Sequence, residues 1–339
     1  MFQVSKAAVT SAFLVTSYFA VFTPAKADKG GLKGDTGKVG AAIPVLWQNP
    51  VDITSRNLFY GPGGKAHEPR GPFTFEREDS AGTNPKFDVV DADGVKWRVK
   101  LGEEAGPETV ASRLVWSVGY FANEEYFLPV IQVQKMQRLH RGNSHVSPDG
   151  TILRVRMKRH MPEEKKLGTW SWSKSPFKDS QEWYGLRVLM AVLNNWDLKD
   201  RNNSIYLTRE SPPVERYVVS DLGASFGPTG LNGATKGDPS AYCDSKWIKQ
   251  VSGEFVDFHV PSPPAMQHYI NIPEMTLRLR LVWLGRHIPR AHARWIGQKL
   301  AQLSPQQIRD AFRAGGYSAQ DVERLSLVVE RRIAELNKL

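Results

Sequence analysis

Apolar and polar residues alternate in several short stretches of the first half of the chain, which predicts strands. Residues 73–77 alternate in this way, and residues 86–101 form a predicted hairpin with its turn at Asp93-Gly94. In the second arm of the hairpin the two faces separate cleanly, with Val95, Trp97, Val99 and Leu101 on one and Lys96, Arg98 and Lys100 on the other. Residues 130–136 and 151–157 predict two further strands, so this half is expected to be β-rich.

Helical spacing of apolar residues appears in three places. Residues 107–119 predict one helix, because a proline suits its first turn and a glycine ends it. Residues 180–194 predict a second helix, which leads directly into a run of polar residues. The chain from Met275 onward is predicted to be helical, and its last helix, over residues 319–337, carries an apolar stripe that indicates packing.

Four segments lack a clear period. Residues 28–42 are rich in glycine and lysine and predict a flexible linker. Residues 43–72 predict irregular structure packed on the β-rich part of the chain. Residues 160–179 are charged and rich in tryptophan, which suggests an excursion near the mouth of a cleft, and residues 228–273 are rich in glycine and proline.

The N-terminal residues predict export. Lys6 precedes an apolar run over residues 7–22, and Ala25-Lys26-Ala27 is a small-x-small cleavage site. This pattern predicts a signal peptide over residues 1–27, cleaved near Ala27, and a periplasmic or extracellular protein. The alternative is an uncleaved membrane anchor, but the run is short and contains several hydroxyl side chains. We therefore expect no stable transmembrane anchor.

Composition narrows the class only a little. A chain of 339 residues allows two domains or one bilobal domain, and 41% apolar with 24% charged residues is typical of a globular protein. The net charge of +10 suits a polyanion partner or scattered surface charge. No basic run is long enough for a tail, so we expect no specific nucleic acid. Cys243 is the single cysteine, and the motifs of zinc sites and serine hydrolases are absent.

The candidate chemistry lies between residues 194 and 227. Asp197 opens the sequence D-L-K-D-R-N, which ends at Asn202, and Asp221 opens D-L-G after a short apolar run. In phosphoryl transfer, one carboxylate orients the attacking hydroxyl, while a second carboxylate and an amide oxygen hold metal ions. Either motif alone is typical of an ordinary turn. The two together, in this order and separated by a strand, indicate a catalytic site.

Two upstream features extend this set. Lys100 ends a predicted strand and Glu108 lies in the first turn of the next predicted helix, the arrangement in which a glutamate holds a lysine toward nucleotide phosphates. Glu103 and Glu104 are alternative partners for the lysine. Between the first two predicted strands, a loop of small residues would allow backbone N–H groups to approach phosphates, although an ordinary hairpin loop fits equally well. That loop contains Gly82, Thr83 and Asn84.

These motifs resemble those of known kinases. The segment D-L-K-D-R-N resembles the catalytic loop of protein kinases, except that Trp196 stands where they have arginine. The segment D-L-G-A-S-F-G over residues 221–227 resembles secretory-pathway kinases related to the Golgi casein kinase. The small-residue loop resembles the phosphate loop of HipA-type toxin kinases and departs from the three-glycine loop of protein kinases. Over residues 73–228 the chain therefore resembles an atypical kinase, with HipA-like, secretory-pathway and phosphoinositide-kinase-like features.

The resemblance implies an α+β, bilobal, protein-kinase-like fold. A small β-rich N-lobe would span residues 43–158 and a mainly helical C-lobe residues 159–339, with ATP and Mg²⁺ or Mn²⁺ between them. Each candidate residue then receives a role from the resemblance: Lys100 contacts the α- and β-phosphates, Glu108 orients Lys100, Gly82, Thr83 and Asn84 cradle phosphates, Asp197 accepts the substrate proton, Lys199 stabilises the transferring phosphoryl group, and Asn202 and Asp221 bind metal. Asp200 is an alternative base.

The predicted function is an exported kinase-like phosphotransferase that moves the ATP γ-phosphate to a hydroxyl group of a protein, glycan or lipid. Bacterial envelope compartments carry little ATP, so one alternative is an exported pseudokinase that binds a nucleotide or a partner without transfer. A third is a polyanion-binding surface protein, for which only the basic charge matters. The presence of every polar residue that transfer needs favours the enzyme.

Overall fold

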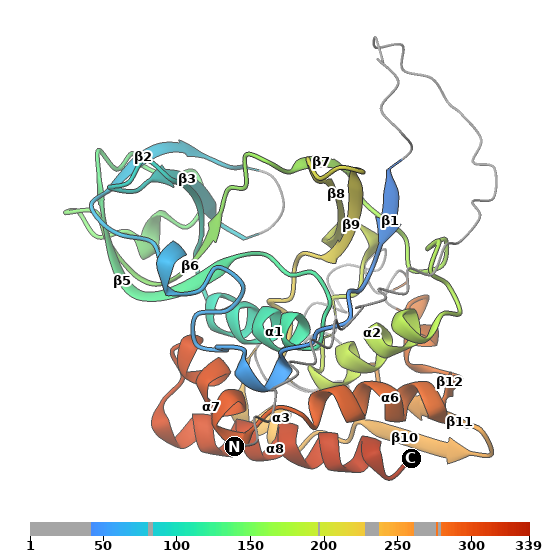
Figure 1. The fold of residues 1–339 in the computed structure, drawn as a ribbon. Coiled ribbons are helices and arrows are strands. Elements are labelled where there is room, and N and C mark those ends of the chain that lie inside the picture. Colours follow the sequence, from blue (N-terminus) through green and yellow to red (C-terminus); the bar gives the residue numbers. More distant parts are fainter. Residues whose placement is uncertain (1–41, 81–83, 196, 228–236, 261–275, 277–278) are drawn as a thin grey trace, which may run out of the picture. The chain divides into compact units, whose positions relative to one another are not determined.

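The structure is a computed structural model that describes residues 42–80, 84–195, 197–227, 237–260, 276 and 279–339. Its N-terminal part is rich in strands and its C-terminal part is mainly helical (Figure 1). Buried apolar side chains form one cluster in each part. The predicted α+β, bilobal fold class is thereby confirmed. The predicted signal peptide and the residues Gly82 and Thr83 lie outside the described residues.

Five strands of the N-terminal part close into a barrel, in the order β2-β3-β4-β6-β5. Neighbouring strands are antiparallel, except that β2 pairs with β5 in parallel. The strands are β2 (Phe73–Glu78), β3 (Lys86–Val90), β4 (Lys96–Lys100), β5 (Glu125–Gln134) and β6 (Thr151–Arg159). Apolar residues of these strands form the barrel's core, including Phe87, Val99 and Met157.

Helix α1 (Ala105–Ser117) connects the barrel to the helical part. It is buried along almost its whole length, because it packs on β5 and β6 and also on α7 (Pro305–Ala314), as Figure 1 shows. Gly106 allows the close approach to α7, since a Cβ atom there would lie 2.7 Å from the carbonyl oxygen of Gly315. The first turn of α1 therefore has a fixed position relative to both parts.

A second sheet has the strand order β1-β9-β8-β7. It consists of β1 (Ile43–Val45), β7 (Lys165–Gly168), β8 (Asn203–Leu207) and β9 (Val214–Val219). The β8–β9 hairpin separates the two acidic motifs along the chain. Strand β1 was not predicted, because three residues are too short to show alternation. The first half of the segment after it packs on the helical part, since Leu46, Ile53 and Leu58 join the core of the helices. Its second half packs on the barrel as expected, since the hydroxyl of Tyr126 on β5 donates to the carbonyl oxygen of Gly64 at 2.7 Å.

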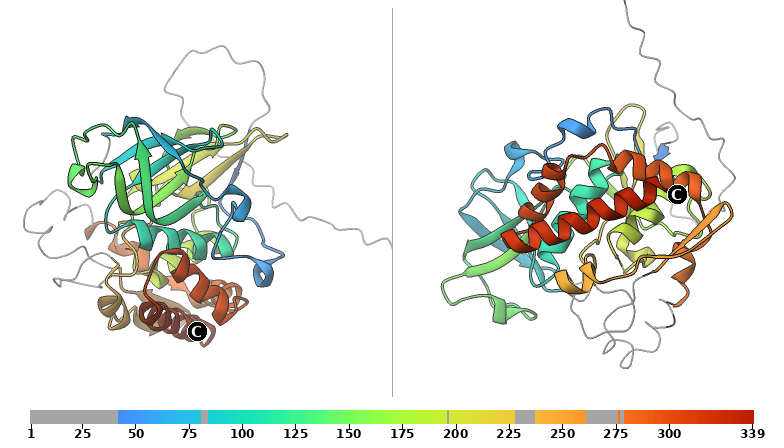
Figure 2. Two further views of the ribbon diagram at one scale, coloured as in Figure 1. Left: turned by 90° about the vertical axis from the view of Figure 1, so that its left-hand side faces the viewer. Right: turned by 90° about the horizontal axis from the view of Figure 1, so that it is seen from below.

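The helices of the C-terminal part pack mostly on one another. They are α2 (Gln181–Val192), α3 (Pro239–Cys243), α6 (Arg290–Leu300), α7 and α8 (Ala319–Asn337). Helix α8 runs beside α3, α6 and α7 (Figure 2). Ser180, Ser304 and Ser318 cap α2, α7 and α8, each through a side-chain oxygen that accepts a backbone N–H. Within the described parts of the chain, no helix combines the length and apolar character needed to span a bilayer.

One small sheet corrects the sequence prediction. Strands β10 (Ile248–Ser252) and β11 (Phe255–Phe258) lie in the stretch where the pattern showed no period, and β12 (Ile288–Pro289) lies in the tail predicted as helical. The three strands pair antiparallel. Strand β10 is mostly exposed and β12 has two residues, so neither carries the apolar alternation from which a strand is predicted.

Candidate active site

The turn after α2 sets the position of the D-L-K-D-R-N segment. Asn194 adopts a left-handed conformation with φ of 52°, which asparagine tolerates better than most residues. Its side-chain Nδ2 donates to the carbonyl oxygen of Gly227 at 2.9 Å. Asn195 donates to Ser225 Oγ at 3.3 Å, and its Oδ1 accepts the N–H of Asp197 at 2.9 Å. The two buried asparagines therefore hold the start of the D-L-K-D-R-N segment (residues 197–202) against the end of the D-L-G-A-S-F-G segment (residues 221–227).

Asp197, Lys199 and Asn202 are brought together by this loop. The Lys199 ammonium lies 2.9 Å from Asp197 Oδ1, and Asn202 Nδ2 donates to the carbonyl oxygen of Asp197 at 2.7 Å. The Asp197 side chain is 18% exposed, so a ligand can reach it while Lys199 holds one of its oxygens. A carboxylate in this setting is able to accept a proton from a bound hydroxyl group.

The β8–β9 hairpin brings Asp221 to the same end as Asn202. Asn203 pairs with Val219 in the ladder, and the N–H of Ser220 donates to the carbonyl oxygen of Asn202 at 2.8 Å. Asn202 directly precedes β8 and Asp221 comes two residues after the end of β9, so both residues lie at the same end of this pair of strands. Each of these two side chains carries an oxygen of the type that hard divalent cations prefer.

Lys100 is the centre of a buried cluster of charges. Its Nζ lies 2.6 Å from Glu104 Oε2, 2.9 Å from Glu108 Oε2 and 3.1 Å from Asp221 Oδ1. The lysine was predicted on the polar face of its strand, yet it is only 4% exposed. Burial by itself lowers the pKa of Lys100, but the carboxylates of Glu108, Asp221 and Glu104 raise that pKa well above its ordinary value. The side chain is therefore a buried ammonium ion.

Glu108 is shared between two cations. Its Oε2 binds Lys100, and its Oε1 accepts a hydrogen bond from Arg156 Nη2 at 2.8 Å. Burial raises the pKa of Glu108 to about 7, and the charges of Arg156 and Lys100 oppose that rise. Arg156 lies on β6 and was not singled out from the sequence, where it is one of several basic residues in an alternating strand. It fixes the carboxylate that in turn fixes Lys100.

Glu104 joins three features of the candidate site. Besides Lys100 it accepts a hydrogen bond from Asn84 Nδ2 at 2.5 Å, at the end of the small-residue loop. It also packs on Gly223 of the D-L-G turn, where a Cβ atom would lie 2.7 Å from Glu104 Cβ. Of the alternative glutamates near Lys100, Glu104 therefore makes contact, whereas Glu103 is exposed. The glycine of the turn is needed because the glutamate occupies the space of a side chain.

Three carboxylates of this cluster lie close enough to hold a cation. Glu104, Glu108 and Asp221 offer oxygens that all lie within 4.8 Å of one another. Oxygen donors of this kind suit Mg²⁺ or Mn²⁺. The Nδ2 of Asn202 donates to the carbonyl oxygen of Asp197, so the amide oxygen is the atom that Asn202 can offer to a cation.

Asp200 lies outside this cluster. It is exposed, and its Oδ1 accepts the N–H of Trp172 at 3.2 Å. The contact fastens the tryptophan-rich segment to the short helical turn over residues 200–202. Trp170 and Trp172 are themselves buried and pack edge to face with ring centroids 4.8 Å apart.

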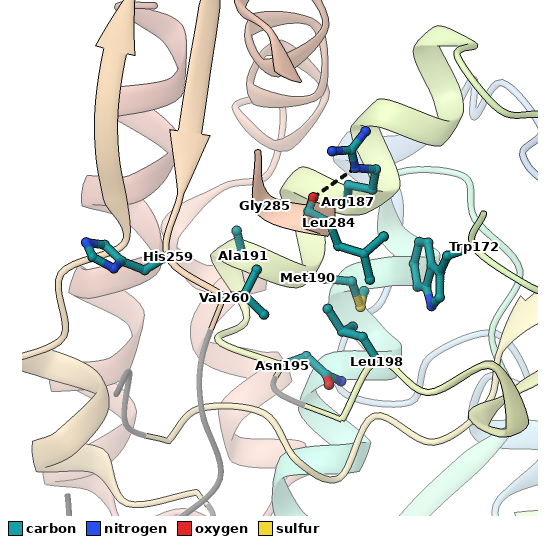
Figure 3. Close-up of a pocket in the computed structure, with 10 residues that line it drawn as sticks. All are labelled: Trp172, Arg187, Met190, Ala191, Asn195, Leu198, His259, Val260, Leu284 and Gly285. Carbon is teal, nitrogen blue, oxygen red and sulfur yellow. Dashed lines mark hydrogen bonds between the residues drawn. The ribbon is translucent and has the colours of Figure 1, made fainter. Parts of the chain in front are cut away.

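A cavity of about 10 Å³ is lined by Asn195 and Leu198, at the start of the D-L-K-D-R-N segment (Figure 3). Met190 and Leu284 contribute apolar walls, and Arg187 Nε donates to the carbonyl oxygen of Leu284 at 2.8 Å. A volume of this size is enough for about one water molecule. The cavity is therefore part of the support of the loop and has no room for a nucleotide.

The chain was compared with known families, curated proteins and solved structures. No known family matches the chain, and no curated protein matches its sequence. Among solved structures, the chain is similar to the proinflammatory kinase CtkA of Helicobacter pylori, with 12% identity over 80% of this chain and 98% of that chain and a TM-score of 0.44. It is also similar to the Golgi casein kinase, with 10% identity, 80% and 72% coverage and a TM-score of 0.38. A structure of the Golgi casein kinase with Mn and ADP bound gives 11% identity, the same coverage and a TM-score of 0.36.

The class of fold can be stated from this chain's own elements. A barrel strand ends in Lys100, the next helix carries Glu108, and a hairpin then separates an Asp-Asn loop from a D-L-G turn. This is the order of elements in a kinase-like fold.

Proposed function

We propose that the chain is an exported phosphotransferase of the kinase-like class, which moves the γ-phosphate of ATP to a hydroxyl group of a protein, glycan or lipid. The observation that carries the proposal is the contact of Lys100 with both Glu108 and Asp221. Asp221 is 121 residues from Lys100 in the sequence and follows β9 of the second sheet, whereas Lys100 ends β4 of the barrel. Protein kinases hold the nucleotide phosphates and their metal ions with a lysine that a helix glutamate aligns beside a D-x-G aspartate.

The site residues fit a nucleotide and a divalent cation. Lys100 would hold the α- and β-phosphates, while Glu108 keeps its ammonium group in place. Asn84, which contacts Glu104, would approach the phosphates beside Lys100. Asp221 and Asn202 would hold Mg²⁺ or Mn²⁺, which supplies positive charge to the phosphate oxygens when bound.

The transfer step then falls to Asp197 and Lys199. Asp197 orients the acceptor hydroxyl and accepts its proton as the oxygen attacks the γ-phosphorus. The new P–O bond forms while the bond between the γ-phosphorus and the bridging oxygen breaks, and that oxygen leaves with ADP. Lys199, whose ammonium lies beside Asp197, would offset the negative charge on the phosphoryl group during transfer.

Nucleotide binding tests the proposal directly. We expect the protein to bind MgATP and Lys100→Met to weaken that binding by roughly 1.5–3 kcal/mol, the range for hydrogen bonds to charged groups. Isothermal titration calorimetry measures the affinity, and circular dichroism checks the fold. Lys96→Met is the matched control, because Lys96 lies on the same strand and is exposed. Equal affinities for wild type and Lys100→Met, with both folded, would remove Lys100 from the binding site.

Export is tested at the N-terminus. Because Ala25-Lys26-Ala27 resembles a cleavage site after an apolar run, the mature chain is expected to begin at Asp28. Expression of the full sequence in a secreting host, followed by N-terminal sequencing of the product, gives the answer. A mature protein that begins at Met1 or Phe2 would contradict the proposed export by cleavage.

A further inference from the structure

Arg332 of α8 is a fully buried arginine without an acidic partner in the part of the chain that the structure describes. Its relative exposure is 0%, and no carboxylate among the described residues lies within ion-pair distance of it. Burial lowers the pKa of Arg332 below its ordinary value. Burying a cation without an opposite charge costs folding free energy. The groups that it does contact therefore call for an explanation beyond packing.

The guanidinium group of Arg332 binds the end of α2 and the turn that follows. Its Nη1 donates to the carbonyl oxygens of Ala191 at 3.2 Å and Val192 at 2.8 Å, and to Asn194 Oδ1 at 2.7 Å. The last carbonyl groups of a helix have no partner within the helix and carry partial negative charge, so a cation is favourable there. The fixed fork of an arginine can reach several of these oxygens at once.

Aromatic rings and a serine hold the guanidinium in place from the other side. Its Cζ lies 4.4 Å from the ring centroid of Tyr242 and 5.3 Å from that of Trp247. Tyr242 also donates its hydroxyl to the carbonyl oxygen of Val192 at 2.7 Å, and Arg332 Nη2 donates to Ser245 Oγ at 2.7 Å. These contacts fix the position of the Arg332 guanidinium group, and the guanidinium group in turn fixes the end of α2 and the side chain of Asn194.

Asn194 connects Arg332 to both acidic motifs, because it lies three residues before Asp197 and its side chain binds Gly227 at the end of the D-L-G-A-S-F-G segment. Arg332 fixes its Oδ1, which leaves its Nδ2 to donate to Gly227 and to Ser245. Without the arginine, a side chain held at a positive φ loses the contact that fixes its amide orientation. Asp197 lies three residues further on, whereas Lys100 is held by a separate set of contacts.

We propose that Arg332 is a positioning residue for phosphoryl transfer, which acts through Val192 and Asn194 to hold Asp197 in its reactive place. The inference rests on the proposed function and adds a part of the chain that carries no kinase motif. It implies that loss of Arg332 slows transfer while nucleotide affinity, which depends on Lys100 and its partners, stays the same.

Arg332→Lys keeps the charge but cannot reach all four acceptors. We expect a kcat about 10- to 100-fold below that of the wild type, the effect of a displacement of about 1 Å at a reacting group. The Kd for MgATP should stay within about twofold of the wild-type value. Arg331→Lys is the matched control, because the neighbouring arginine is exposed and forms only a 4.0 Å contact with Glu335. Its kcat and Kd should equal those of the wild type.

Hydrogen exchange supplies a readout that does not depend on transfer. In Arg332→Lys the amides of Asn194, Asn195 and Asp197 should exchange at least about tenfold faster than in the wild type, while those of β4 are unchanged. The proposal is overturned if exchange and kcat both remain at the wild-type level. It is also overturned if kcat, Kd and β4 exchange change together, because Arg332 would then serve only the general stability of the fold.

Two further arms keep the outcomes distinct. If the wild type transfers no phosphate to any acceptor, the proposed function fails, and exchange at Asn194 and Asp197 still decides whether Arg332 positions the turn. If Arg332→Lys does not fold, Asn194→Gly removes the hydrogen bond to Arg332 together with those to Gly227 and Ser245, and glycine accepts a φ of 52° without strain. That variant should show the same loss of kcat with unchanged Kd, and a wild-type kcat would contradict the proposal.

Discussion

Asp197→Asn is expected to slow phosphoryl transfer by about 10²–10⁴-fold, the usual contribution of a general base, while the affinity for MgATP changes little. An asparagine keeps the volume of the side chain and can still accept a hydrogen bond from Lys199, but it is a poor proton acceptor. The proposed nucleotide contacts belong to Lys100 and Asp221 and do not include Asp197. Transfer of labelled phosphate and calorimetric titration with MgATP measure the two quantities separately.

Asp200→Asn is the control for that result. Asp200 is exposed and accepts the N–H of Trp172, and an asparagine oxygen can do the same. Transfer by this variant should remain close to the wild-type rate. If Asp200→Asn abolishes transfer and Asp197→Asn does not, the assignment of the base is wrong. If the wild type binds MgATP and never transfers phosphate, the protein is a pseudokinase.

Asp221→Asn is expected to separate metal-dependent from metal-free binding. The substitution removes a carboxylate from the proposed cation site, so Mg²⁺-dependent binding of ATP should weaken by roughly 1–3 kcal/mol. Binding without metal should survive or improve, because one negative charge that faces the phosphates is gone. Titrations with ATP in the presence of Mg²⁺ and of a chelator measure both affinities.

Glu103→Gln is the matched control for the removal of charge. Glu103 is exposed and lies next to Glu104 in the sequence, so the variant loses one negative charge without losing a proposed ligand. Its dependence on Mg²⁺ should equal that of the wild type. If Asp221→Asn also keeps the wild-type dependence, Asp221 is not a ligand of the metal ion.

The sequence predicted the local features of this protein well, because these follow from short-range periodicity. The alternation in β4 predicted the strand and the face of Lys100, and a proline and a glycine bracketed α1 to within two residues. The predicted neighbour Glu108 does contact Lys100. Burial of the lysine was not predicted, because it results from the D-L-G turn and α1 meeting over the end of the strand.

Contacts between distant residues account for what was missed. Glu104 and Glu103 are equivalent in sequence, and the contacts of Glu104 with Lys100, Asn84 and Gly223 distinguish them. Arg332 looks like one more charged residue of an amphipathic helix, yet it is buried against Asn194, 138 residues earlier. Strand β1 has no pattern of its own, since its pairing with β9 alone defines it. No spacing rule links residues so far apart in the sequence, so only the structure shows that Arg332 contacts the turn before Asp197.

The long separation between Arg332 and the turn at Asn194 has a consequence for the order of folding. Closing a contact over 138 residues costs more conformational entropy than closing a short loop, so we expect it to form late. The pair Lys100–Glu108 spans eight residues and can form as soon as β4 and α1 exist. A chain emerging during synthesis or translocation would therefore assemble its barrel and lysine–glutamate pair first. It would acquire a rigid reaction centre only once α8 has docked, so the competence to hold a nucleotide precedes the competence to use it.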